Sequence, residues 1–198
     1  MPQVRPAPHT GKGNMSILQP DLHQQLRAES LATRQRLMDL VRPLDAARLS
    51  ERPEPKGWSV AEVLEHLCVT HEVTSAAGAA AGTSARADAG APAREWRPSF
   101  LGKLIAGALV SPRKTKAPKA FQIGPTPRSA VVETLHDYEV AFLQSMDDAA
   151  SLDWRAVKVR LTALPFLAPR INLGDGFRIH VVHVTRHTNQ IERVISKL

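Results

Sequence analysis

The sequence is poor in cysteine, and this shortage narrows the classes of protein that it can encode. Cys68 is the only cysteine among 198 residues, so no disulfide can form within the chain. Disulfides are typical of exported proteins, and residues 1–19 contain no apolar stretch of the length that a secretory signal needs. We therefore expect the protein to act in the reducing cytoplasm, with residues 1–19 as a disordered tail of proline, glycine and basic residues.

Aromatic residues are also few, at 5% of the chain, and β-branched residues seldom alternate with polar ones as they do in a half-buried strand. Apolar residues instead recur at helical spacing, as at Leu22 and Leu26. The pattern predicts an all-α protein whose first helix covers about 21–42 and ends before Pro43. The length suits one domain with a sizeable core, which we place at residues 20–198.

Three more long helices are expected, each with a signal at its N-terminus. They are a second helix over about 59–80 with Ser59 and Glu62 as a capping box, a third that begins at Thr126 and Pro127, and a fourth over 176–194 with Asp175 as its candidate cap. Residues 154–170 contain prolines that interrupt any long element.

No apolar run reaches the roughly 20 residues that a membrane-spanning helix needs. Residues 98–110 form a short apolar stretch between the second and third helices, and they follow a glycine- and alanine-rich segment, 82–97, that is typical of a flexible linker. We expect an extra short helix there that covers the bundle or contacts a second copy in a homodimer. Binding to a membrane surface, with basic residues at 113–119 behind the helix, is the less favoured alternative.

The net charge of +7 does not identify a partner. The basic residues are spread along the chain, and no helix-turn-helix, zinc-finger or stacking-aromatic pattern accompanies them. We interpret the charge as solvated surface and expect no specific nucleic-acid partner.

The most informative residues are histidines in the last predicted helix. At about 100° per residue, His180, His183, His187 and Gln190 fall within one narrow sector of the helix, beside Ile191. This sector is the apolar one, so the imidazoles face inward. Two histidines one turn apart commonly bind a metal, whereas buried histidines that are satisfied by hydrogen bonds remain the alternative at this stage.

The second predicted helix offers a further ligand. His66 shares its face with Val63 and Thr70 and therefore also points inward. Cys68 lies about 200° around that helix from His66, which makes it a poor ligand. His71 lies about 140° from His66 and is expected to face solvent or an interface.

Two motifs resemble the DinB-like superfamily of metal-binding four-helix bundles, which is related to bacillithiol transferases and mycothiol-dependent maleylpyruvate isomerases. They are G-W-S-x-x-E-x-L-x-H-L at 57–67 and H-x-x-x-H-x-x-Q-I at 183–191. The resemblance covers about residues 20–198. It implies a four-helix bundle in which His66, His183 and His187 hold one divalent metal, with Zn²⁺ expected and Ni²⁺ as the alternative.

Three neutral imidazoles leave positions open on a metal, as in catalytic sites, where the metal activates a water or a thiol. The resemblance implies thiol transfer or a related metal-dependent reaction such as hydrolysis, on a small-molecule substrate and with a low-molecular-weight thiol as a candidate cosubstrate. His180 and Gln190 are then expected beside the metal site, in contact with its ligands or with substrate. The alternative is a bundle that keeps a metal for stability or sensing without turnover.

Overall fold

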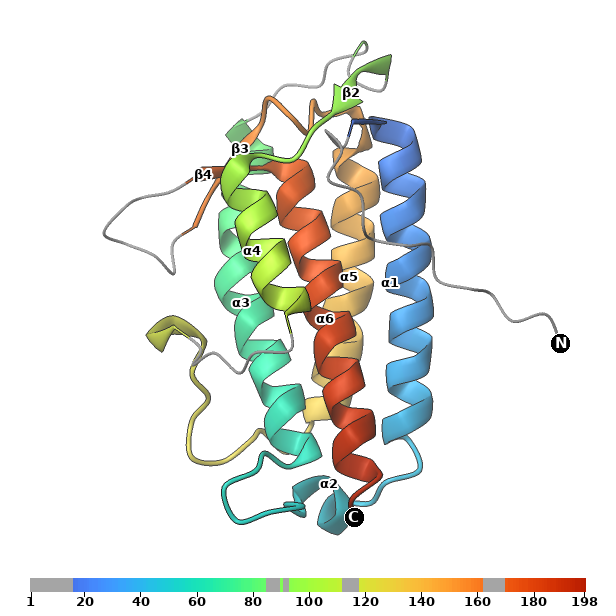
Figure 1. The fold of residues 1–198 in the computed structure, drawn as a ribbon, viewed down its shortest axis with the longest axis vertical. Coiled ribbons are helices and arrows are strands. Elements are labelled where there is room, and N and C mark those ends of the chain that lie inside the picture. The colour runs from blue at the N-terminus through green and yellow to red at the C-terminus, as the bar shows by residue number, and fades with distance from the viewer. Residues whose placement is uncertain (1–15, 85–89, 91–92, 112–117, 162–169) are drawn as a thin grey trace, which may run out of the picture.

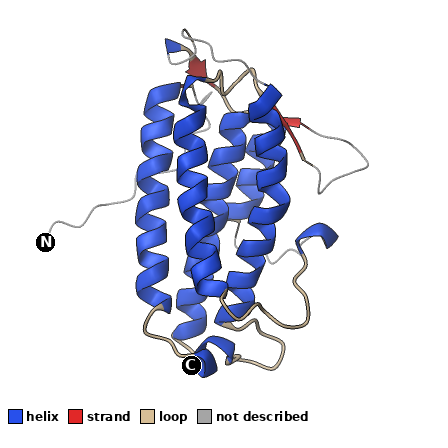
Figure 2. Cartoon of the chain, turned by 180° about the vertical axis from the view of Figure 1, so that it is seen from behind, coloured by secondary structure: helices blue, strands red, loops and turns tan. Residues whose placement is uncertain are grey.

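Four long helices form a bundle in the computed structural model, which describes residues 16–84, 90, 93–111, 118–161 and 170–198 (Figures 1 and 2). They are α1 (Gln19–Val41), α3 (Val60–Ser84), α5 (Val131–Asp148) and α6 (Leu173–Ile195). Helices α1 and α3 each pack against both α5 and α6, so α1 and α3 occupy opposite corners of the bundle. The predicted all-α four-helix bundle is confirmed.

Shorter elements close the ends and one side of the bundle. The helical ones are α2 (Ala46–Ser50), α4 (Phe100–Val110), η2 (Lys119–Phe121) and η3 (Ala149–Ser151). Two antiparallel strand pairs are made by β1 (Ile17–Leu18) with β2 (Glu95–Trp96) and by β3 (Lys158–Arg160) with β4 (Arg170–Asn172). No helix in the described part of the chain is both long enough and apolar enough to cross a bilayer.

The core consists of two apolar clusters. The first, around Phe142 and Phe177, lies toward the start of α6, and the second, around Leu135 and Ile191, lies toward its end. On α5 the two clusters are separated by the buried Glu139, which contacts His180 of α6. Because burial of a polar group without a hydrogen bond is costly, Glu139 needs a polar partner, and His180 is that partner.

Helix α4 is the predicted extra helix, and side chains of α6 bind it at both ends. The backbone N–H of Ser99, its N-cap, donates to Asp175 Oδ2 at 3.0 Å. At the other end Arg186 donates to the carbonyl oxygens of Leu109 and Ser111. A carboxylate at the start of a helix and a cation at its end both interact favourably with the helix dipole. These contacts hold α4 along α6.

The outer side of α4 is apolar and exposed. Phe100 is 84% exposed, and Leu104 and Val110 also face outward, whereas Gly102 and Ala106 are buried against the bundle. The homodimer contact expected on this segment stays a prediction, with these three side chains as its candidate surface.

The flexible linker predicted over 82–97 is wrong at both ends. Helix α3 continues to Ser84, and Trp96 is only 1% exposed because its indole N–H donates to Asn172 Oδ1 at 2.9 Å. Residues 17–19, which were predicted to belong to a tail, instead form β1 and the start of α1. Residues 1–15, 85–89, 91–92, 112–117 and 162–169 lie outside the described residues.

Two predicted helix starts are also corrected. Helix α5 begins at Val131 rather than at Thr126, because the backbone N–H of Arg128 donates to Glu65 Oε2 on α3 at 3.0 Å and not to a helical partner. Helix α6 begins earlier than predicted, with Asn172 as its N-cap. Asp175 is the third helical residue and completes the capping box instead of starting it.

The two glycines of α4 predict opposite effects of substitution by alanine. A Cβ at Gly102 would overlap the carboxyl group of Asp175, whereas a Cβ at Gly107 meets nothing within 4 Å. We expect Gly102→Ala to lower the free energy of unfolding by about 1–3 kcal/mol. The matched Gly107→Ala should raise it by about 0.5–1 kcal/mol, because alanine favours a helix. Urea unfolding followed by circular dichroism measures both, and equal effects would contradict the packing of α4 on α6.

Candidate metal centre

A capping box fixes the start of α3 and, with it, the position of His66. The backbone N–H of Ser59 donates to Glu62 Oε2 at 2.8 Å, and the N–H of Glu62 donates to Ser59 Oγ at 3.2 Å. This capping box was predicted from the sequence. His66 follows one turn after Glu62 and is 5% exposed, so the predicted inward face of α3 is confirmed.

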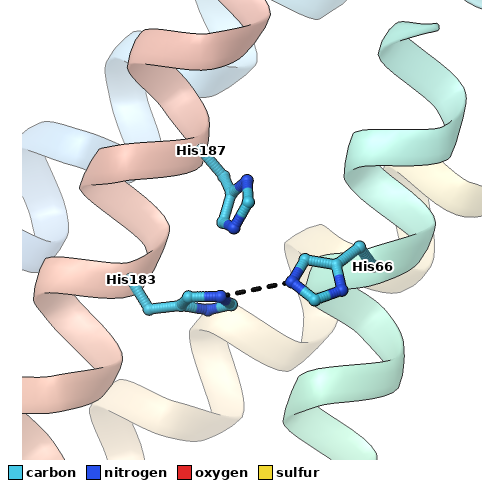
Figure 3. A group of neighbouring side chains, drawn as sticks. All are labelled: His66, His183 and His187. Carbon is cyan, nitrogen blue, oxygen red and sulfur yellow. Dashed lines mark hydrogen bonds between the residues drawn. The ribbon is translucent and has the colours of Figure 1, made fainter. Parts of the chain in front are cut away.

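Helix α6 brings two further imidazoles to the same level. Asn172 and Asp175 form its capping box, and His183 and His187 follow one turn apart on the side that faces α3 (Figure 3). The distance between ring centroids is 4.8 Å for His66 and His187, 5.2 Å for His66 and His183, and 4.5 Å for His183 and His187. One nitrogen from each ring lies within 4.8 Å of the other two.

Hydrogen bonds at the outer nitrogens orient two of the rings. His66 Nδ1 lies 3.0 Å from the carbonyl oxygen of Phe121 in η2, and His187 Nδ1 lies 2.9 Å from Gln190 Oε1. In a neutral imidazole that donates from Nδ1, the other nitrogen, Nε2, keeps its lone pair. The Nε2 atoms of His66 and His187 are therefore set up to accept, and they face the interior of the cluster.

Burial keeps the three imidazoles neutral. Desolvation lowers the pKa of His66, and it lowers the pKa of His187 to about 3 with the help of charge repulsion from His66. The pKa of His183 is well below its ordinary value, first through desolvation and then through repulsion from His187 and His66. Neutral imidazole is the form that binds a metal ion.

The spacing of the nitrogens fits a divalent cation. His66 Nε2 and His183 Nε2 are 3.3 Å apart. Two nitrogens bound at 2.0–2.1 Å to a tetrahedral ion would be separated by about 3.3–3.4 Å. The His66 and His183 nitrogens therefore have the spacing of two ligands of one ion, and the nitrogens of all three histidines lie within 4.8 Å of one another.

The cluster lines an open cleft between α3, α4 and α6. The cleft wall also includes Thr70 on α3, Ala106 on α4, Phe121 and His180. A metal bound by three histidines from one side would have its remaining positions directed away from those ligands, where an exogenous molecule can bind.

Of the other residues expected near the site, Gln190 contacts His187 directly, and His180 lies outside the three-histidine cluster. Cys68 is fully buried elsewhere, its Sγ 3.8 Å from the carbonyl oxygen of Val131, and burial raises the pKa of its thiol to about 12. It contributes no atom to the cluster, as expected.

His71, which was expected to face solvent or an interface, is half-buried and packs against α5. Its ring stacks on Tyr138 at 4.5 Å and meets the edge of His180 at 5.8 Å. Desolvation lowers its pKa to about 4. The angle of about 140° from His66 is correct, but it points His71 toward α5, where the bundle provides a partner instead of water.

Sequence reasoning did not identify Glu139, whose carboxylate is 1% exposed and lies 3.1 Å from His180 Nε2. A signal for it was present, because Glu139 falls on the apolar stripe of α5 between Leu135 and Phe142. The carbonyl of Phe121 had no such signal, because a backbone contact across 55 residues leaves no residue-type pattern.

The comparisons with known proteins agree with this arrangement. A family model described as DinB superfamily matches residues 31–191, which include all three histidines of the cluster. No curated protein and no solved structure matches the chain.

Because the buried imidazoles stay neutral in the folded protein, the stability of the metal-free protein should depend on pH. Between about pH 6.5 and pH 3 the unfolded chain binds a proton at His187 that the folded chain excludes. Stability is therefore full above about pH 6.5 and falls as the pH is lowered through this window. We expect the free energy of unfolding of His187→Gln to fall less steeply than that of the wild type between about pH 7 and pH 5. Urea unfolding midpoints in the presence of a chelator measure this difference. Parallel profiles for the two proteins would contradict a buried, neutral His187.

Proposed function

Because the chain belongs to the DinB superfamily and brings three neutral imidazoles together in a cleft, we propose that it is a metal-dependent enzyme acting on a small molecule. In this proposal His66, His183 and His187 hold one divalent metal. The observation that carries it is the convergence of the three rings, two of which, His66 and His187, already have partners for their outer nitrogens in Phe121 and Gln190.

The ligand set suits Zn²⁺ first and Ni²⁺ second. Imidazole binds both, and the tetrahedral spacing of the His66 and His183 nitrogens favours zinc. When bound, such an ion lowers the pKa of a coordinated thiol or water and polarises an electrophile. The contribution of the chain is to hold the three neutral ligands, to fix their tautomers through Phe121 and Gln190, and to leave the cleft side open.

The charges around the cluster favour an anionic ligand. None of the three histidines carries a negative charge, so a divalent metal would keep its full positive charge there. Arg186 and Arg193 lie close enough to His187 to help to lower its pKa. A thiolate, formed from a low-molecular-weight thiol, is a suitable ligand for such a site. We therefore propose thiol transfer to a small electrophile as the reaction, in the reducing cytoplasm where free thiols persist.

The non-catalytic alternative makes a different prediction about metal removal. A metal kept for stability would be needed for folding, and chelation would melt the bundle. Here the two apolar clusters draw on all four long helices, so the fold has a source of stability that does not depend on the metal.

We predict that protein purified without added metal contains about one divalent ion per chain and conjugates a small thiol to an electrophile. Chelation should end this activity and leave most of the helical circular dichroism signal at room temperature. His183→Ala should lose both the metal and the activity, because two ligands from two helices hold an ion far more weakly than three do.

The matched control is His23→Gln, which removes a histidine on α1 that pairs with Asp147 at 2.9 Å and belongs to no metal cluster. This variant should keep its metal and its activity. Retention of stoichiometric metal by His183→Ala would contradict the ligand assignment. Normal metal content without turnover on any thiol and electrophile pair, or melting on chelation, would favour the non-catalytic alternative.

A further inference from the structure

Among the described residues, the buried carboxylate of Glu139 on α5 pairs with a histidine rather than with a lysine or arginine. Glu139 is 1% exposed, and its partner is His180, at 3.1 Å from Oε1 to Nε2. Burial of a carboxylate costs desolvation free energy that a hydrogen bond from a histidine offsets only in part. A carboxylate that contacts the wall of a cleft through His180 therefore suggests a chemical role.

The ring of His180 is held in one orientation from several sides. Phe142 stacks on it at 3.8 Å between ring centroids, with 19° between the planes, and His71 meets it edge-on at 5.8 Å. The carboxylate of Glu139 accepts from Nε2–H, which leaves Nδ1 as the proton-accepting nitrogen. Nδ1 has no hydrogen-bond partner among the described residues, and it is not one of their buried unpaired atoms. It is therefore accessible from the cleft, which His180 lines.

The position of His180 along α6 places it next to the metal ligands but not among them. It precedes His183 by three residues, which is about 4.5 Å along the helix axis. Helices α3 and α6 run in opposite directions (Figure 1), so Thr70, which follows His66 by one turn, lies toward the level of His180. Both line the same cleft as the three-histidine cluster.

We propose that His180, oriented by Glu139, accepts the proton of a thiol that binds at the three-histidine cluster. The S–H bond breaks, its electron pair stays on sulfur, and a new N–H bond forms at His180 Nδ1. The carboxylate of Glu139 then balances the imidazolium. The other titratable groups facing His180 are His71 on α3 and His183 on α6, and burial keeps both of them neutral. Glu139 is therefore the group that supplies negative charge. This inference rests on the proposed function.

The test counts the protons that reach solvent when a thiol binds. Zinc-loaded protein is titrated with 2-mercaptoethanol at about pH 8, where the free thiol is still mostly protonated, by calorimetry in two buffers of different ionisation heat. The wild-type protein should release close to no proton, because His180 retains it. His180→Gln should release about one proton per bound thiol. Glu139→Gln should also release more than the wild type, and it keeps the shape of the side chain should His180→Gln fold poorly.

His23→Gln is the matched control, since it removes an imidazole that contacts Asp147 and Trp154 rather than His180, and it should behave as the wild type. Zinc content and circular dichroism are measured for every variant. Equal proton release from wild type, His180→Gln and Glu139→Gln would overturn the role of His180 while leaving the proposed function intact. Failure of the zinc-loaded wild type to bind the thiol would instead contradict the proposed function, and with it this inference.

Discussion

The convergence of three neutral imidazole rings on one point is the constraint on which the rest of the site depends. Phe121 and Gln190 occupy the outer nitrogens of His66 and His187, so the Nε2 lone pairs of these two rings are left for the centre of the cluster, where His66 Nε2 lies 3.3 Å from His183 Nε2. A divalent cation at that centre would accept electron pairs from all three rings. The capping boxes at the starts of α3 and α6 set the positions of the rings along their helices. The segment that follows α4 contributes through η2, since it supplies the carbonyl that turns His66 inward.

Different side chains of the bundle provide its stability and its candidate metal site. Two apolar clusters stabilise the four long helices, and Glu139, His180 and the cleft-facing histidines lie among their side chains. Burial among these apolar side chains is also what lowers the pKa of each metal-facing imidazole. The same packing that stabilises the fold therefore keeps the ligands neutral and ready to bind, and α4 adds one wall of the cleft through its attachments to Asp175 and Arg186.

Helical periodicity was enough to predict the long helices and the inward faces of the histidines, whereas the choice of His66, His183 and His187 as one group came from the resemblance to the DinB-like superfamily. Periodicity placed His66, His183 and His187 inward without knowledge of how the helices pack. The differences from the predictions arose where contacts between distant segments decide the outcome. Trp96 is buried because Asn172 accepts its N–H from 76 residues away, and His71 turns inward because Tyr138 and His180 are present across the bundle. Glu139 could have been found from its apolar stripe, but its partner could not be chosen before α5 and α6 were known to face each other across the interior of the bundle.

X-ray absorption spectroscopy of the zinc-loaded protein tests the three-histidine site most directly, because it reports the ligands of the metal itself. The arrangement of His66, His183 and His187 predicts three imidazole nitrogens at about 2.0–2.1 Å, no sulfur in the absence of added thiol, and a lighter ligand from solvent in the remaining position. Addition of a small thiol should introduce one sulfur at about 2.3 Å while the three imidazoles remain. A spectrum of the thiol-free protein with fewer than three imidazoles, or with sulfur from Cys68, would contradict the site.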